Sequence, residues 1–371
     1  MRYLKPDYFE DFTCVAGECP DTCCAGWQIM IDEESLDYYG EVSGAFGKRL
    51  RDSIDWQEGA FYQCDKRCAF LNEKDLCDIY TELGEGALCQ TCKNYPRHVE
   101  EFEGLREYTL SLSCPVAAEM ILGQQKFPVF VETEDDAEDE LADEFEDFDI
   151  LLFTQLEDAR AVVMKHLKEA EMCLEEKMAL YLKLAAQMQE CIDKGEFFEI
   201  DTVIRQFEKG QFPWAGELEE TLRFVHRKEL FAHIYDLERL REEWTNVLEG
   251  LEENLYTQGE DSYWHQVEVF EGWLKEDEAR MQKWEQVGLQ LFVFFLYTYF
   301  CGAVYDDWIY SKMALAVESV RFIRELYLAR WVEEGTLTRE DYVELAYRYA
   351  REIEHSDPNL NALEEYFAER G

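Results

Sequence analysis

The sequence predicts a mainly α-helical protein: an N-terminal cysteine-rich α+β module followed by a large helical bundle. Two observations support this fold class. Ten of the thirteen cysteines lie within the first 114 residues, and beyond residue 150 apolar side chains recur at the 3.6-residue spacing of helices. Only two prolines follow residue 150, so long helices are permitted there. We therefore expect a cysteine-rich domain over residues 1–131, an acidic linker over 132–149 and an all-helical domain over 150–371.

The N-terminal cysteines are too dense to be explained by packing alone. They read C-x4-C-x3-C-C and then C-x3-C-x8-C-x11-C-x2-C. Disulfides are one explanation, but they persist mainly in oxidising compartments. The chain opens without an apolar leader segment, so we expect a cytoplasmic protein, in which clustered cysteines more often bind metal. The candidate metal ligands are Cys14, Cys19, Cys23, Cys24, Cys64, Cys68, Cys77, Cys89, Cys92 and Cys114.

Short elements are predicted between these cysteines and residue 132. Asp32 is a plausible N-cap for a helix that follows it, and two short strands flank a polar turn at residues 72–75. Residues 106–114 alternate apolar and polar side chains like an edge strand. Pro115 then opens a helix, and residues 126–132 form one more strand.

An acidic run over residues 132–149 reads as a solvated linker or helix face, with a docking segment for a basic partner as the alternative. Long helices are predicted after it, with Thr336 or Thr338 as the cap of the last one. They cover residues 151–171, 175–195, 198–210, 216–237, 241–256, 262–287, 286–305, 306–334 and 339–355.

The stretch 286–305 contains no charged residue and is long enough to cross a membrane. Glutamine, threonine and tyrosine residues interrupt it, and acidic residues flank both of its ends. There is no Lys/Arg bias close to Tyr305. We therefore predict a buried core helix and no membrane span.

The formal net charge of −46, from 82 acidic and 36 basic residues, excludes some functions. Such a surface repels phosphate backbones and anionic lipids, so no nucleic-acid partner is expected. A lysine-bearing partner would be attracted within a screening distance of about 10 Å at ordinary salt.

Three motifs, in order, resemble a known family. CPDTCCAGW (residues 19–27), CAFLNEKDLCDIY (68–80) and LCQTCKNYPR (88–97) resemble the zinc- or iron-chelating cysteine-rich domain with a CxxxCC element. The form of the third motif, with the opening MRYLKPDYF, is similar to the flagellin lysine-N-methylase branch. The late stretch over residues 306–330 resembles the helical C-terminal part of those proteins.

This resemblance implies a protein lysine N-methyltransferase that acts on flagellin or a similar lysine-bearing protein. It implies S-adenosylmethionine as the methyl donor and favours a [4Fe-4S] iron–sulfur cluster over zinc. Tyr95 and Arg97 belong to the third motif and are candidate cofactor-binding residues, with packing around the cysteines as the alternative role. His98 follows them and is a candidate ligand or hydrogen-bond donor.

The residues set limits on this chemistry. A radical C-x3-C-x2-C signature is absent, and methylation of an amine is a polar displacement that requires a neutral lysine rather than a radical. No glycine-rich nucleotide loop precedes a helix in the required context. The catalytic residues are not assigned. A non-catalytic zinc- or iron-binding interaction module and an electron carrier stay open as alternatives.

Overall fold

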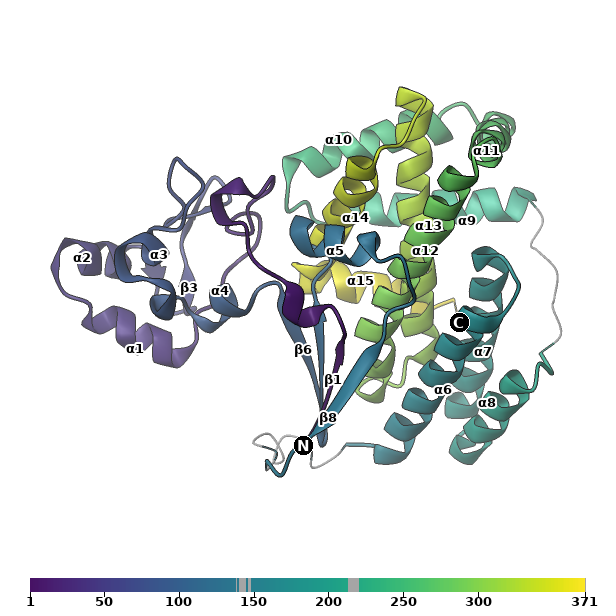
Figure 1. Ribbon diagram of the computed structural model, residues 1–371, viewed down its shortest axis with the longest axis horizontal. Coiled ribbons are helices and arrows are strands. Elements are labelled where there is room, and N and C mark those ends of the chain that lie inside the picture. The colour runs from purple at the N-terminus through teal and green to yellow at the C-terminus, as the bar shows by residue number, and fades with distance from the viewer. Residues whose placement is uncertain (138, 140–144, 146–147, 213–219, 371) are drawn as a thin grey trace.

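The computed structural model describes residues 1–370 apart from 138, 140–144, 146–147 and 213–219, and the protein is mainly helical (Figure 1). A bundle of long helices occupies one side of the molecule. The small elements of residues 14–94, here called the cysteine-rich segment, lie to the other side of a sheet (Figure 1). The predicted fold class is therefore correct in its helical majority.

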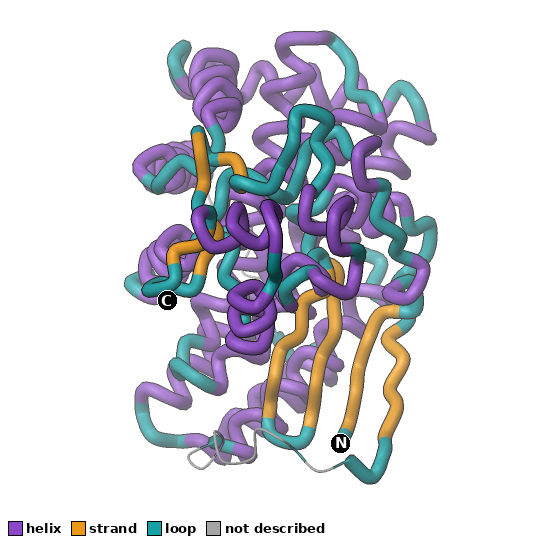
Figure 2. The backbone as a smooth tube through the Cα atoms, turned by 90° about the vertical axis from the view of Figure 1, so that its left-hand side faces the viewer, coloured by secondary structure: helices purple, strands orange, loops and turns teal. Residues whose placement is uncertain are grey.

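A four-stranded sheet in the order β6-β7-β1-β8 lies between these two parts (Figures 1 and 2). Its strands are β1 (Arg2–Pro6), β6 (Arg97–Phe102), β7 (Leu105–Leu110) and β8 (Phe130–Glu134). Strands β6 and β7 form a hairpin, and β1 pairs with β7 in parallel and with β8 antiparallel. Strand β7 is therefore interior, and its prediction as an edge strand is wrong. All its residues except Tyr108 are buried, because the sheet packs against the helices.

The cysteine-rich segment has a hydrophobic core of its own, which includes Tyr39, Phe61 and Phe70 and is separate from the main core. The Asp32 side chain caps the first helix of the segment by accepting from Ser35 N, as predicted. The helices are α1 (Glu33–Glu41), α2 (Gly44–Asp52), α3 (Asp78–Leu83) and α4 (Gln90–Asn94), and the two short hairpins are β2 (Ile54–Asp55) with β3 (Ala60–Phe61) and β4 (Gln63–Cys64) with β5 (Arg67–Cys68).

The helical body begins at Pro115, which occupies the first turn of its first helix as predicted. Thr338 caps α14 in a capping box with Asp341, which settles the predicted choice of caps. The helices of the body are α5 (Pro115–Gly123), α6 (Ile150–Glu169), α7 (Leu174–Asp193), α8 (Ile200–Glu208), α9 (Glu220–Asp236), α10 (Glu242–Leu251), α11 (Glu260–Lys275), α12 (Glu278–Tyr299), α13 (Ile309–Glu334), α14 (Arg339–Glu354) and α15 (Asp357–Ala368).

Helices α12 and α13 lie at the centre of the body. One helical stretch, Glu278–Val304, is long and apolar enough to cross a membrane by length and composition, and 83% of its apolar window is buried in the fold. The prediction of a core helix is therefore confirmed. Its predicted start is wrong, because α11 ends at Lys275 and Asp277 caps a new helix.

Candidate functional site

All thirteen cysteines are free thiols. Nine of the ten predicted ligands interact electrostatically in two groups, and the tenth, Cys64, is exposed beside Asp65. We call the first group the junction thiols: Cys14, Cys19, Cys23 and Cys114. We call the second group the segment thiols: Cys24, Cys68, Cys77, Cys89 and Cys92. Each group holds at least the four sulfurs that a zinc ion or a [4Fe-4S] cluster takes.

The adjacent residues Cys23 and Cys24 belong to different groups. A hydrogen bond between their thiols lowers the pKa of Cys24 to about 7 against the effect of burial, and the same hydrogen bond together with burial raises the pKa of Cys23. The backbone of Cys24 is tied to the segment, because its carbonyl accepts from Cys68 N at 2.9 Å. The C-x3-C-C element thus connects the two groups through adjacent thiols.

Cysteine thiols are suitable metal ligands, but these thiols lie too far apart in the structure to surround one metal ion. Among the residues that the structure describes, no three His, Cys, Asp or Glu side chains are arranged to hold a metal ion. Burial raises the pKa of Cys68 to about 12 and that of Cys114 to about 11, so both thiols are protonated near pH 7. Metal binding would require these thiols to lose protons and to move closer together.

Tyr95 and Arg97 lie where the cysteine-rich segment passes into the sheet. Helix α4, which carries Cys92, ends at Tyr95, and β6 begins at Arg97. The Tyr95 hydroxyl is 3.0 Å from Ser113 Oγ. The Arg97 guanidinium donates to the Phe12 carbonyl at 3.2 Å and lies over the Phe12 ring, which points to a packing role for at least part of this side chain.

Both residues line a cavity of about 330 Å³ between the cysteine-rich segment and the helical body, here called the junction cavity. Trp27, Tyr95 and His98 line it from one side, and Tyr299 and Glu354 line it from the helices. The Trp27 indole donates to the Cys23 carbonyl at 2.7 Å. This contact places one wall of the cavity next to the junction thiols.

Glu354 is the central acid of the junction cavity. Its carboxylate accepts from Ser111 Oγ at 2.5 Å, from Ser113 N at 3.1 Å and from the Tyr299 hydroxyl at 3.2 Å. Burial raises the pKa of Glu354, and these hydrogen bonds offset the increase only in part. In the described part of the chain, Glu354 forms no ion pair with lysine or arginine, and the positive charge of nearby His98 acts to lower its pKa.

His355 and His98 extend the polar wall of the junction cavity. The His355 Nε2 atom is 2.9 Å from Ser113 Oγ, and its ring stacks on Trp27 at 4.6 Å. Burial, with Arg351 nearby, lowers the pKa of His355 to about 3, so the ring is neutral near pH 7. His98 is 2.6 Å from Glu100, whose carboxylate raises the His98 pKa against the effect of burial.

Carboxylates and aromatic rings together suit an ammonium group. Glu354 and Glu100 supply negative charge, while Tyr95, Phe294 and Tyr299 supply ring faces and edges. A carboxylate with a raised pKa can also accept a proton near neutral pH. The sequence did not single out Glu354, Ser111 or Ser113, and their meeting depends on contacts about 240 residues apart along the chain.

The fold and cavity define a mainly helical protein in which a thiol-rich segment meets a body that presents a cavity suited to amines. The family model described as the FliB lysine N-methylase C-terminal domain matches residues 160–371, so the chain belongs to this family. The flagellin lysine-N-methylase resemblance is thereby confirmed. No solved structure matches this chain.

Individual relatives are similar over a shorter stretch. The flagellar biosynthetic protein FliU of Salmonella muenchen is 28% identical over 131 residues, which cover 33% of this chain and 78% of the relative. The lysine-N-methylase of Salmonella choleraesuis is 29% identical over 131 residues, a third of each chain, and that of Salmonella typhimurium is 27% identical over the same length. This chain thus spans about a third of those two lysine-N-methylases.

Proposed function

We propose that this protein is a lysine N-methyltransferase for flagellin or a similar protein, with S-adenosylmethionine as the methyl donor. The observation that carries the proposal is the family match, which covers the helical body from Arg160 to the C-terminal end. The names of the relatives, a lysine-N-methylase and a flagellar biosynthetic protein, agree with it. The proposed setting is the cytoplasm.

The junction cavity is the proposed acceptor site for the lysine side chain. The ε-amine reaches the cavity as an ammonium ion, because lysine is protonated near pH 7. Glu354 forms no ion pair with a described lysine or arginine and can bind this group, and the ring edges and faces of Tyr95 and Tyr299 add attraction. The net charge of −46 favours the approach of a lysine-bearing loop.

The methyl donor supplies an electrophilic methyl group, and the residues of this chain prepare the nucleophile. Glu354 accepts the proton from the ε-ammonium, and Ser111, Ser113 and Tyr299 hold its carboxylate in place through their hydrogen bonds. The free lone pair then forms the N–C bond as the S–C bond breaks, and sulfur keeps the electron pair. The methylated amine loses its extra proton to solvent.

The proposed cofactor is a [4Fe-4S] cluster, with zinc as the alternative. The support is the number and chemistry of the junction and segment thiols, each group holding at least four sulfurs. A bound metal would fix the segment from which Tyr95 and Arg97 reach the junction cavity, because Cys89 is the N-cap of helix α4 and Cys92 lies within this helix, directly before them. Its proposed role is to hold this wall of the acceptor site.

The test is direct methylation of a protein substrate. Anaerobically purified protein is incubated with S-adenosylmethionine and flagellin, and lysine peptides are weighed by mass spectrometry. We expect a gain of one or more methyl groups with the wild type and at least a hundredfold slower gain with E354Q. The matched control is E344Q on the same helix, because Glu344 pairs with Arg348 outside the cavity.

Two outcomes would contradict the proposal. Absence of any methyl gain, in protein that retains its metal and binds flagellin, would favour the non-catalytic interaction module. A normal rate with E354Q would keep the activity and remove the junction cavity as its site.

A further inference from the structure

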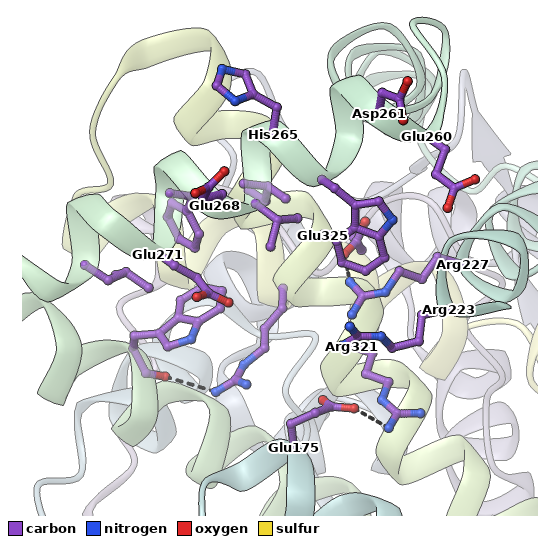
Figure 3. Close-up of a pocket in the computed structure, with 17 residues that line it drawn as sticks. Glu175, Arg223, Arg227, Glu260, Asp261, His265, Glu268, Glu271, Arg321 and Glu325 are labelled. Carbon is purple, nitrogen blue, oxygen red and sulfur yellow. Dashed lines mark hydrogen bonds and ion pairs between the residues drawn. The ribbon is translucent and has the colours of Figure 1, made fainter. Parts of the chain in front are cut away.

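A second cavity, of about 760 Å³, lies within the helical body and shares no lining residue with the junction cavity. Helices α7, α9, α11, α12 and α13 line it, so we call it the body cavity. Figure 3 shows Arg223, Arg227 and Arg321 gathered on one side of the body cavity. The acidic side chains of α11 are spread along the rest of its wall. The proposed methylation does not use this arginine cluster.

Buried donors without acceptors mark the body cavity. In the part of the chain that the structure describes, Arg321 Nε, Arg324 Nε and Trp264 Nε1 are buried and have no hydrogen-bond partner. Among the described residues that line the cavity, no buried side-chain oxygen lacks a partner. Because a buried donor without an acceptor destabilises the fold, a ligand that brings oxygen acceptors would relieve this cost.

Arg324 has weaker polar contacts than Arg227 and Arg321 in the body cavity. Arg227 pairs closely with Glu325, and Arg321 pairs closely with Glu175. Among the described residues, the nearest carboxylate to Arg324 is Glu285 at 3.9 Å, and the guanidinium donates a hydrogen bond of 3.5 Å to the Trp284 carbonyl. Its side chain is nevertheless only 13% exposed.

The sequence makes room for the Arg324 side chain. Gly288 lies inside helix α12, where glycine is less favourable than alanine. A Cβ atom at this position would collide with Arg324 Nη2 and with the Leu174 side chain. Close packing against Leu174 alone would explain part of this requirement, and the position of the guanidinium explains the rest.

The other walls of the body cavity favour a flat ligand of low charge. The Arg324 guanidinium stacks over the Trp284 ring at 4.6 Å, and the Arg223 guanidinium lies over one face of the Trp264 ring at 4.9 Å. Six carboxylate residues and four arginines line the cavity, so a doubly charged anion meets more repulsion than a singly charged one. A carboxylate matches the fork of an arginine in geometry.

We propose that the body cavity binds a small ligand that carries a carboxylate on a planar ring. The carboxylate accepts hydrogen bonds from Arg324 and from the Trp264 indole, and the ring packs against the tryptophans. The site lies in the family-matched part of the chain but is independent of the proposed acceptor site.

The test compares three ligands that share a naphthalene ring and differ only in the group attached to it. Binding of 1-naphthoate, 1-naphthyl phosphate and the neutral 1-naphthol is measured by calorimetry with the full chain. We expect 1-naphthoate to bind at least tenfold more tightly than each of the other two. R324M should remove this preference, while R280M should keep it, because Arg280 stacks on Trp273 outside the cavity.

G288A provides a second variant that keeps the arginine but displaces its guanidinium, so it should also weaken 1-naphthoate binding. Circular dichroism establishes that each variant is folded before binding is measured. Equal binding of 1-naphthoate and 1-naphthol would overturn the proposal, as would unchanged 1-naphthoate binding in folded R324M. Tighter binding of the phosphate would overturn the preference for a carboxylate. A failure of methylation leaves these outcomes unaffected, because none of them is read from activity.

Discussion

Arg160 and Glu107 form a buried ion pair that joins helix α6 of the helical body to strand β7 of the sheet. The guanidinium Nη1 is 2.6 Å from Glu107 Oε2 and 3.1 Å from the Tyr297 carbonyl of α12. Glu107 is 2% exposed and Arg160 is 6% exposed, so neither charge is solvated. Arg160 therefore connects α6, β7 and α12, and β7 belongs to the sheet that lines the junction cavity.

Removing one partner of this pair should destabilise the whole fold. We expect R160M and E107Q each to lower the free energy of unfolding by about 3–5 kcal/mol, because the remaining group stays buried without its partner. Replacing both residues by apolar ones should recover much of this loss. Urea unfolding measures the effect. K48M is the control, because Lys48 and Asp52 form an exposed pair that contributes at most about 1 kcal/mol.

The thiol groups should determine the metal content. We expect serine at Cys19, Cys23, Cys68 or Cys89 to remove most of the bound iron and acid-labile sulfide from anaerobically purified protein. Serine at Cys191 or Cys301 should leave both unchanged, because these thiols are buried in the helical body. Elemental analysis of each variant provides the measurement. Zinc without iron in the wild type would rule out the cluster and leave a structural zinc site.

Glu352 should make stability depend on pH. Burial raises its pKa to about 7, although Leu240 N and Arg241 N donate to it. The folded state therefore holds this proton more tightly than the unfolded chain does. The resulting stabilisation is complete below the ordinary pKa of 4.5 and is lost as the pH rises through 7.

The measurement is the free energy of unfolding between pH 5 and pH 7.5. As the pH rises, the free energy of unfolding of the wild type should fall relative to that of E352Q by up to about 1.4 kcal/mol per pH unit, because glutamine does not titrate. The relevant quantity is how the difference in free energy of unfolding between the two proteins changes with pH. The substitution also changes the free energy of unfolding by an amount that does not depend on pH. Parallel curves for the two proteins would show that Glu352 has an ordinary pKa.

Local signals predicted the helical body well. The 3.6-residue period located most helices from α6 to α14, and Thr338 marked the start of α14. The sequence prediction is wrong where a helix boundary lies close to an apolar run. The predicted helix over 262–287 is split at Asp277, and the apolar run that follows belongs to the same helix as the polar residues before it. The last helix, α15, was missed, although Ser356 caps it and Pro358 occupies its first turn.

The junction cavity was beyond sequence reasoning for a different reason. Tyr95 and Arg97 were singled out because they follow Cys92 in a motif, and they do line the cavity. The sequence around Glu354 contains no motif that indicates a function, since acidic residues at the end of a helix are common. Its surroundings arise only when the sheet docks on α14 and brings Ser111 and Ser113 to its carboxylate.

The pH dependence of methylation should report on Glu354 directly. If Glu354 accepts the lysine proton, kcat/KM rises with pH as this carboxylate ionises, and the limb lies above the usual range of a glutamate because burial raises its pKa. The Tyr299 hydroxyl donates to the carboxylate at 3.2 Å and stabilises its charged form. Y299F should therefore move the limb to higher pH while leaving the rate on the alkaline plateau within about tenfold of wild type.

The control for this shift is Y297F on the same helix, because the Tyr297 hydroxyl donates to the Leu4 carbonyl and does not line the junction cavity. Its pH profile should match that of the wild type. A purely structural role for Tyr299 would lower the rate at every pH without moving the limb. E354Q should abolish the limb altogether, and a limb that survives in E354Q would belong to another group and would exclude Glu354 as the base.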